Sequence, residues 1–303
     1  MLSADVVVLV FAVTVKLSFS LPLCCPAVTQ LSAASFLTIS VFPVSYYNFF
    51  QQLTQLKNTM KCLILAAGYA TRLYPLTENF PKPLLEVKGK AILDWLVDDI
   101  STSGAVTEFI VISNHKFVEH FNKWAKSKPQ SITVLDDGTT SNETRLGAVK
   151  DIQFAIETLK LDDDLLVIAG DNLLDFSLTT FLNYATQHKT SCIMRYYEPS
   201  ETRLRKCGVV QIDENDRILS MTEKSPTPAS HWCCPPFYYY TREDARLVAK
   251  GIDAGCGTDA PGSYIAWLCT QTTVHAMEMP GSRHDIGNLE SYRAVQESYT
   301  GLK

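Results

Sequence analysis

The part of the sequence from Met60 onward predicts an α/β fold, with a mixed, mainly parallel sheet flanked by helices. Short apolar runs of strand length alternate there with segments whose apolar residues recur at helical spacing. This alternation is typical of βαβ units, in which a helix crosses over between two parallel strands. Apolar residues make up 46% of the 303 residues and charged residues 19%, so a sizeable core can be buried.

The first half of this region carries most of the pattern. The apolar run 61–67 leads into Gly68 and is typical of a buried parallel strand that feeds a loop. Apolar residues fall at helical spacing over 91–100, and Gly104 can end that helix. By the same criteria the next expected elements are strands at 109–112, 132–135 and 165–169 and helices at 118–126 and 146–159.

The second half is expected to add strands and one closing helix. These elements are strands at 192–197, 209–212, 218–221 and 237–240 and a last helix that begins near Asn288. The sequence shows no internal repeat and no run of hexapeptides, so no C-terminal β-helix is expected. Ligands of parallel sheets bind beyond the carboxyl ends of the strands, which places Gly68 and Gly170-Asp171 on one rim.

Residues 1–59 differ in composition from residues 60–303. Their only charged side chains are Asp5, Lys16 and Lys57. We therefore expect an apolar extension or leader at 1–59, outside one folded domain at 60–303. Three interpretations stay open: a targeting or anchoring leader, a disordered extension, or an upstream translation artefact. The last is favoured because a strand pattern begins directly after Met60, and no membrane association is expected unless residues 1–59 are retained as an anchor.

Charge and cysteine usage exclude some classes of protein. The net charge is −5, whereas a broad nucleic-acid surface requires clustered Lys and Arg, so no nucleic-acid partner is expected. The nine cysteines follow no regular spacing, which suits a reducing compartment such as the cytoplasm better than a disulfide scaffold.

The densest motif follows the first expected strand. In residues 65–73 a strand runs into a loop of small residues, where main-chain N–H groups can approach phosphate oxygens closely. Arg72 offers a forked donor for phosphate, and Lys82 adds a compact positive charge ten residues later. Pro81 and Pro83 restrict the backbone around Lys82. Together these residues predict a site for the phosphates of a nucleotide.

The same residues resemble the sugar-phosphate nucleotidyltransferase family, whose pattern is an apolar strand, then G-G-x-G-T-R-L-x-P-x-T, then K-P-L. The resemblance extends over nearly all of residues 60–303. It implies a Rossmann-like sheet of the nucleotide-diphospho-sugar transferase type. It also implies a metal-dependent reaction of a nucleoside triphosphate with a sugar 1-phosphate, which gives a nucleotide sugar and pyrophosphate.

Further motifs carry the resemblance along the chain and imply roles for single residues. Gly170-Asp171-Asn172 resembles a strand-end Gly-Asp, Thr222-Glu223-Lys224 a Glu-Lys-Pro box, and His284-Asp285-Ile286-Gly287 a closing Trp-x-Asp-x-Gly-Thr segment. The implied residues are Arg72 and Lys82 for catalysis, Asp171 and Asp285 for Mg²⁺, Ala66, Ala67, Gly68, Thr71, Asn142 and Gly147 for the nucleotide, and Gly208, Glu223 and Lys224 for the sugar phosphate.

The loop after the first strand and the residue before Gly208 depart from the family pattern. Ala67 and Ala70 replace the first and third loop glycines, which we expect to be tolerated only if both keep a negative φ. Cys207 replaces the aromatic residue that precedes Gly208. This last change leaves the identity of the sugar open.

Other functions remain as alternatives. A cytidylyltransferase acting on phosphocholine or another alcohol phosphate shares the first motif, but is expected to lack Gly208 and Glu223-Lys224. A non-catalytic regulatory paralogue is expected to have lost the Arg, the Lys or a metal-binding Asp, and all are present. A glycosyltransferase is expected to carry an Asp-x-Asp motif, which Gly170-Asp171-Asn172 lacks. The base and the oligomeric state stay open, and a homo-oligomer is compatible with the sequence.

Overall fold

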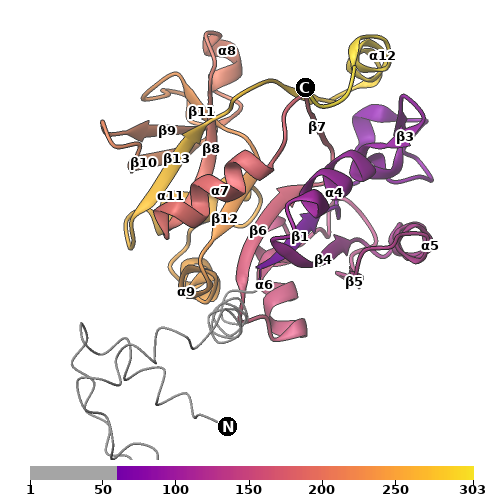
Figure 1. Cartoon of the computed structure of the whole chain (residues 1–303), viewed down its shortest axis with the longest axis horizontal. Helices are drawn as coiled ribbons and strands as arrows, with labels where there is room; N and C mark the ends of the chain where they lie inside the picture. Colours follow the sequence, from indigo (N-terminus) through magenta and orange to yellow (C-terminus); the bar gives the residue numbers. More distant parts are fainter. Residues whose placement is uncertain (1–59) are drawn as a thin grey trace, which may run out of the picture. The chain divides into compact units, whose positions relative to one another are not determined.

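A computed structural model describes residues 60–303, and the predictions made for residues 1–59 lie outside the described residues (Figure 1). Its main feature is a ten-stranded mixed sheet, in which β13 (Val274–Glu278) pairs with β8 beside the main path of strands. In spatial order that path is β10 (Ile218–Glu223), β9 (Gly208–Ile212), β11 (Trp232–Cys234), β8 (Ser191–Tyr197), β12 (Phe237–Tyr240), β6 (Asp164–Ala169), β1 (Met60–Leu65), β4 (Val106–Ser113) and β5 (Ile132–Asp136).

The first half of the chain forms the predicted parallel part of this sheet. Strand β1 lies between β4 and β6 and pairs in parallel with both, and β4 pairs in parallel with β5. Successive side chains of β1 enter opposite cores, because Cys62 and Ile64 join one buried cluster and Leu63 joins the other. A strand buried on both faces accounts for the continuous apolar run in the sequence.

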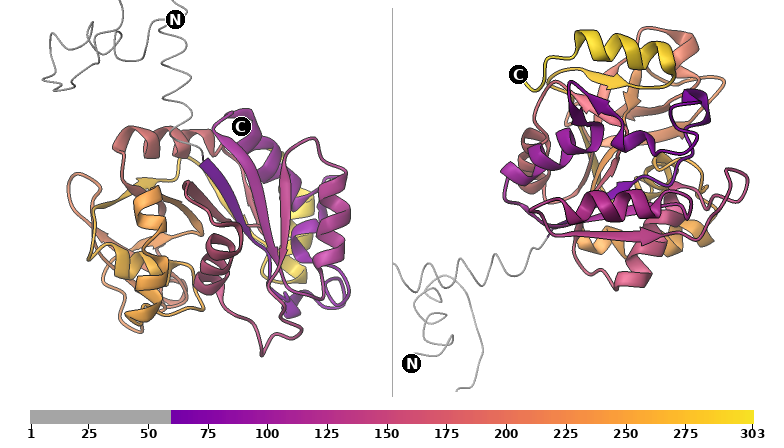
Figure 2. Two further views of the ribbon diagram at one scale, coloured as in Figure 1. Left: turned by 90° about the horizontal axis from the view of Figure 1, so that it is seen from below. Right: turned by 90° about the vertical axis from the view of Figure 1, so that its right-hand side faces the viewer.

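Helices cover both faces of the sheet (Figure 2). The core of one face includes α4 (Ile92–Thr102), α5 (Val118–Lys126) and α7 (Thr179–His188). The core of the other includes α6 (Ala148–Leu159), α10 (Val248–Asp253) and α11 (Gly262–Leu268). The three helices predicted in the first half are confirmed as α4, α5 and α6, and α5 has the predicted bounds.

The second half combines antiparallel and parallel pairing. Strand β12 pairs antiparallel with β6 and β8, whereas β13 pairs in parallel with β8. The four strands predicted here are confirmed, but the sequence did not predict β11, β13, α7, α8 (Glu201–Leu204), α9 (Arg242–Ala245), α10 or α11.

Two small sheets complete the fold. One is the hairpin of β2 (Glu86–Val87) and β3 (Lys90–Ala91), and the other pairs β7 (Asn172–Leu174) with β14 (Arg283–Asp285). The second pairing brings residues more than a hundred positions apart in sequence next to the carboxyl end of β6.

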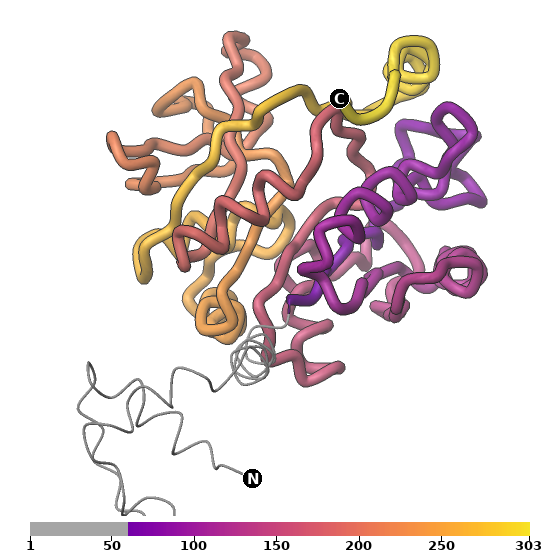
Figure 3. The backbone as a smooth tube through the Cα atoms, in the orientation of Figure 1, coloured from indigo at the N-terminus to yellow at the C-terminus, as the bar shows by residue number. Residues whose placement is uncertain are grey.

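The last helix, α12 (Leu289–Ser298), begins one residue after Asn288, as predicted. The Asn288 side chain accepts from the backbone N–H of Ser291, and the Ser291 hydroxyl accepts from that of Asn288, which completes a capping box. The helix lies beside the β2–β3 hairpin (Figure 3). Tyr292 Oη on the helix donates to Glu86 O of the hairpin over 2.7 Å. No helix within residues 60–303 is both long enough and apolar enough to cross a membrane.

Candidate active site

A cavity of about 430 Å³ opens at the carboxyl ends of β1 and β6. This is the rim on which the sequence placed Gly68 and Asp171. The predicted site residues that line it are Ala66, Gly68, Thr71, Arg72, Lys82, Asn142 and Asp171. Tyr69, Ala70, Arg145, Ile286 and Gly287 also line the cavity, although no site role was predicted for them.

The small-residue loop that follows β1 is held by buried hydrogen bonds. The predicted strand 61–67 ends at Leu65 in the structure, so Ala66 and Ala67 belong to this loop. Asn114 Nδ2 donates to Ala67 O over 2.9 Å, and Tyr69 Oη donates to Thr139 O over 3.0 Å. The loop is therefore tied to the ends of β4 and β5, the two strands on one side of β1.

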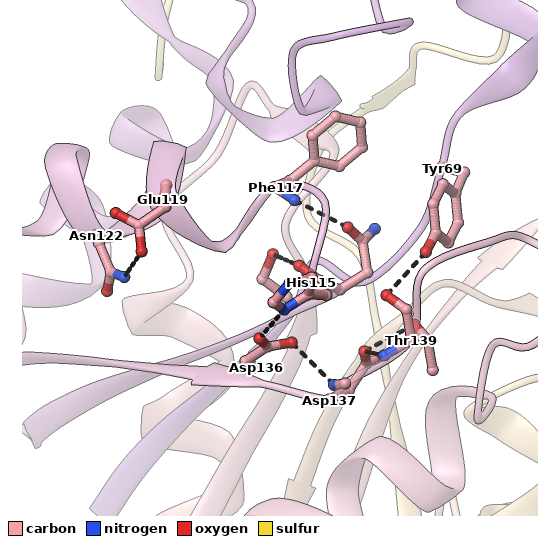
Figure 4. A network of polar contacts seen from close by, with 11 residues as sticks. Tyr69, His115, Phe117, Glu119, Asn122, Asp136, Asp137 and Thr139 are labelled. Carbon is pink, nitrogen blue, oxygen red and sulfur yellow. Dashed lines mark hydrogen bonds and ion pairs between the residues drawn. The ribbon is translucent and has the colours of Figure 1, made fainter.

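These ties belong to a larger polar network at the ends of β4 and β5 (Figure 4). His115 Nδ1 lies 2.6 Å from Asp136 Oδ2, and this contact raises the pKa of the histidine. Asp137 Oδ1 accepts from the backbone N–H and the hydroxyl of Thr139, each over 2.7 Å. The network fixes the start of the loop 138–147, which carries Asn142.

The expectation that both loop alanines keep a negative φ is wrong for Ala70. Its φ is 47° and its ψ 41°, a left-handed conformation, whereas Ala67 is not among the residues with positive φ. The chain turns there into a short 3₁₀ helix, Thr71–Leu73, and Ala70 O accepts from Thr77 Oγ1 over 2.8 Å and from Leu73 N over 2.9 Å. These bonds hold Ala70 in a conformation that costs an L-residue about 1–2 kcal/mol.

Lys82 and Asp171 form an ion pair at the floor of the cavity. Lys82 is 7% exposed, and its Nζ lies 2.7 Å from Asp171 Oδ2. A buried ammonium requires a partner of opposite charge, and the Asp171 carboxylate supplies it. The residue predicted to hold phosphate and the residue predicted to hold metal are thus in direct contact.

Asp285 lies close to Asp171 through the pairing of β14 with β7. Asp285 stands directly opposite Asn172, the residue that follows Asp171. Asp285 itself does not line the cavity, but its neighbours Ile286 and Gly287 do. The β7–β14 pairing therefore brings Asp285 next to the residue that follows Asp171, although the two predicted metal ligands are far apart in sequence.

Gly147 precedes α6 and does not line the cavity. Its φ is 94°, and a Cβ added there would lie 2.5 Å from Thr258 O. Thr258 O also accepts from Val149 N over 3.0 Å, so the backbone at Thr258 lies very close to the start of α6. The close approach of Thr258 therefore requires a residue without a side chain at position 147, which the sequence did not indicate.

The predicted sugar-phosphate residues form a second group, outside the residues that line the cavity. Glu223 pairs with Gly208 across β9 and β10, and a Cβ at Gly208 would lie 2.8 Å from Glu223 Oε1. Burial raises the pKa of Glu223. Lys224 is exposed and has a φ of 50°.

Asp259 connects this group to the cavity, and sequence reasoning missed it. Its Oδ1 accepts from Arg145 Nη2 over 2.9 Å and from Arg145 Nε over 3.2 Å, and its Oδ2 lies 3.6 Å from Lys224 Nζ. The bonds from Arg145 hold the pKa of Asp259 below its usual value. No local pattern marks Asp259, because its partners lie 114 and 35 positions earlier (259 − 145 and 259 − 224).

Comparison with known proteins decides the family. The nucleotidyl transferase family model matches residues 61–301, which is most of the chain. The chain belongs to this family. The match covers all the predicted site residues, from Ala66 to Asp285.

Curated relatives of this nucleotidyl transferase are distant but cover most of it. The bifunctional protein GlmU of Methanocaldococcus jannaschii is 27% identical over 231 residues, which is 75% of this chain and 51% of the relative. The UTP–glucose-1-phosphate uridylyltransferase AglF of Haloferax volcanii is 26% identical over 236 residues, 76% of this chain and 93% of the relative. The chain thus spans about half the length of the first relative and nearly all of the second.

Solved structures share the fold of this nucleotidyl transferase. An apo UDP-glucose pyrophosphorylase superposes with a TM-score of 0.68 and 17% identity, covering 80% of this chain and 98% of that one. The UDP-glucose pyrophosphorylase of Acinetobacter baumannii gives a TM-score of 0.63 at 17% identity, covering 78% and 92%. They support the Rossmann-like fold of the nucleotide-diphospho-sugar transferase type.

The donor atoms of the site fit a hard cation. Within residues 60–303 no group of three or more His, Cys, Asp or Glu side chains is arranged to hold a metal ion by itself. Mg²⁺ commonly takes one or two carboxylates and completes its shell with substrate phosphates and water. Asp171 has a 38% exposed side chain and Asp285 is exposed, so both can offer oxygen atoms of the kind that Mg²⁺ prefers.

Proposed function

We propose that this nucleotidyl transferase joins a nucleoside triphosphate to a sugar 1-phosphate and releases pyrophosphate, with Mg²⁺ as cofactor. The observation that carries the proposal is the cavity itself, which Arg72 lines together with the Lys82–Asp171 ion pair and the loop after β1. Asp285 supports it, because the β7–β14 pairing sets Asp285 opposite Asn172, the residue that follows Asp171.

The reaction requires positioning more than proton transfer. An oxygen of the sugar phosphate forms a bond to the α-phosphorus, and the bond from that phosphorus to pyrophosphate breaks in line with it. The second pKa of a phosphate monoester is about 6, so the nucleophile is already ionised at neutral pH and needs no general base. The site has to bring anions together and neutralise their charge.

The residues of this chain divide that task. The loop 66–71 receives the triphosphate, and Arg72 and Lys82 stabilise the α-phosphate and the departing pyrophosphate. Asp171 and Asp285 would hold Mg²⁺, which supplies positive charge between the phosphates when it is bound.

The second group receives the attacking substrate. Lys224 binds the phosphate of this substrate, and Glu223, beside Gly208, contacts its hydroxyl groups. Asn142 and Gly147 contribute to binding of the nucleotide. The names of the relatives favour a sugar 1-phosphate as the acceptor, because AglF is a glucose-1-phosphate uridylyltransferase. A cytidylyltransferase acting on an alcohol phosphate and a non-catalytic regulatory paralogue are the alternatives that the experiment below separates.

We further propose that residues 60–303 act as one catalytic domain in the cytoplasm, without a nucleic-acid partner. Seven cysteines lie in the part of the chain that the structure describes, and all are free thiols. Free thiols suit a reducing compartment. Cell fractionation tests this location directly.

The decisive experiment is pyrophosphate release by the full-length protein with Mg²⁺. Each common nucleoside triphosphate is combined with each member of a panel of sugar 1-phosphates plus phosphocholine. We expect release that depends on one sugar 1-phosphate and falls by about 10²–10³ in Asp171→Ala, since removal of one charged contact in a transition state costs that much. Glu214→Ala, at an exposed acid in a turn, is the matched control and should keep full activity.

The other outcomes each identify an alternative. Release with CTP and phosphocholine alone would establish the cytidylyltransferase. Nucleotide binding without release for any pair would establish the regulatory paralogue.

A further inference from the structure

A chain of hydrogen bonds leads from Arg283 on β14 to the Asp171 carboxylate. Arg283 Nη1 donates to Asn172 Oδ1 over 2.7 Å, and Asn172 Nδ2 donates to Asp171 Oδ1 over 2.9 Å. Lys82 Nζ occupies the other carboxylate oxygen, Oδ2, at 2.7 Å. Each oxygen of Asp171 therefore has its own donor. One of these donors, the Asn172 amide, is itself hydrogen-bonded to Arg283.

Partners at both ends fix which way the Asn172 amide faces. Arg283 donates to its oxygen, while Asp171 Oδ1 and, over 3.4 Å, Ala169 O accept from its nitrogen. An amide has a donor end and an acceptor end that differ little in shape, so its hydrogen-bond partners decide its orientation. A guanidinium can only donate, which requires Oδ1 of Asn172 to face Arg283 and leaves Nδ2 to face Asp171. Asn172 is 1% exposed, so water cannot take the place of these partners.

Arg283 is itself held in place on two sides. It lies opposite Leu174 in the β7–β14 pairing, and its Cζ lies 5.8 Å from the ring centroid of Tyr196 on β8. In the family pattern a tryptophan stands two residues before the aspartate, at the position that Arg283 occupies here. An indole offers a single N–H, whereas the guanidinium offers a fork of donors, so the orientation of Asn172 by Arg283 is a feature of this chain.

We propose that Arg283 and Asn172 are positioning residues, which orient the Asp171 carboxylate for the metal ion. The inference rests on the proposed function, in which Asp171 is a metal ligand. A carboxylate has about four lone-pair sites, and donors from Asn172 and Lys82 fix its plane while leaving sites open to the cavity. Partners behind a metal ligand commonly change metal affinity by about 10–100-fold when they are removed.

The test is the binding of Mn²⁺ to the full-length protein without nucleotide, followed by electron paramagnetic resonance of the free ion. We expect Arg283→Met to weaken Mn²⁺ affinity by about 10–100-fold, because the buried Asn172 Oδ1 then loses its donor and the amide is held less firmly against Asp171. Arg283→Lys keeps a cationic donor and should restore most of the affinity. The matched control is Arg246→Met, which removes an exposed arginine bound to Asp162 and should bind Mn²⁺ like the wild type.

A second measurement separates orientation from a general loss of structure. The Mg²⁺ concentration for half-maximal pyrophosphate release should rise in Arg283→Met, while the nucleotide KM at saturating Mg²⁺ stays near that of the wild type. If Arg283→Met does not fold, Arg283→Gln takes its place. A neutral amide donates a weaker hydrogen bond than a guanidinium, so it should hold Asn172 less firmly and weaken binding as well.

Asp171→Ala separates failure of this inference from failure of the proposed function. Mn²⁺ affinity that falls in Asp171→Ala but not in Arg283→Met would overturn only the positioning role. Unchanged affinity in Asp171→Ala would overturn the metal ligand itself, and the positioning role with it. Loss of affinity in both variants, with recovery in Arg283→Lys, is the expected result.

Discussion

Ala70 lines the cavity and has an unfavourable backbone conformation. Its left-handed conformation, with a φ of 47°, lies in a region that glycine adopts freely and alanine adopts only at a cost in energy. Replacement by glycine removes the strain in the folded state but adds conformational freedom to the unfolded chain. Strain at positive φ exceeds that entropy term, so Ala70→Gly should raise the free energy of unfolding by about 0.5–1 kcal/mol.

Chemical denaturation followed by circular dichroism measures this change. Ala67→Gly is the matched control, because Ala67 lies in the same loop and is not among the residues with positive φ. It should lower the free energy of unfolding by about 0.5–1 kcal/mol. Equal effects of the two substitutions would contradict the argument, since they would show that the backbone of Ala70 carries no extra cost.

Among the helices and strands, those of the first half were predictable because their patterns are local. Helix α5 shows its apolar period within its own nine residues, and β1 and β6 are continuous apolar runs. Helix α11 has seven residues and β13 alternates only weakly over five, so each carries little local pattern of its own. Short elements owe their structure to neighbours that are distant in sequence.

The site follows the same rule. The common location of Arg72, Lys82 and Asp171 at one cavity was predictable, because their motifs follow β1 and β6 along the chain. Asp259 and Arg283 act through partners 114 and 111 residues away, and no spacing in the sequence marks such pairs. The left-handed turn at Ala70 was missed for another reason, since alanine does not indicate a positive φ.

Helix α6 carries a buried acid that makes stability depend on pH. Asp151 is 6% exposed, and burial, with a smaller contribution from the charge of Asp137, raises its pKa to about 7. The unfolded pKa is about 3.9, so the folded state binds the proton more tightly and stability falls as pH rises from about 4 to about 7. Asp151→Asn removes this titration, and it should be more stable than the wild type by roughly 2–4 kcal/mol at pH 8.

Urea denaturation at pH 4, 6 and 8 checks this expectation. The stability difference between Asp151→Asn and the wild type should be small at pH 4 and grow through pH 6. Glu157→Gln, an exposed acid on the same helix, should show no such trend. A difference that stays constant from pH 4 to pH 8 would mean that Asp151 does not titrate differently in the folded state.

At the scale of residues 60–303, one carboxylate joins the nucleotide end of the site to the substrate end. Asp259 binds Arg145, which lines the cavity, and lies 3.6 Å from Lys224, which we propose as the ligand of the attacking phosphate. Arg145 and Lys224 are also the cations that would attract the phosphate groups of the substrates. If Lys224 binds the attacking phosphate as proposed, Asp259 competes with that phosphate for Lys224 while it accepts hydrogen bonds from Arg145.

Asp259→Asn separates these two effects. The amide oxygen can still accept from Arg145, but the negative charge beside Lys224 is removed. The Lys224 and Asp259 side chains are 57% and 59% exposed, and an exposed ion pair is worth about 0.2–1 kcal/mol. We therefore expect the KM for the sugar 1-phosphate to fall by about two- to five-fold with little change in kcat, as less charge opposes the phosphate.

Steady-state kinetics of pyrophosphate release at two salt concentrations tests both the size and the cause of this effect. The advantage of Asp259→Asn should shrink at high salt, because screening weakens the Lys224–Asp259 pair in the wild type. Asp253→Asn, at an exposed acid six residues earlier, should leave KM unchanged. A rise in KM for Asp259→Asn would show that the carboxylate acts mainly by holding Lys224 and Arg145 in position, so that substrate binding gains from its charge.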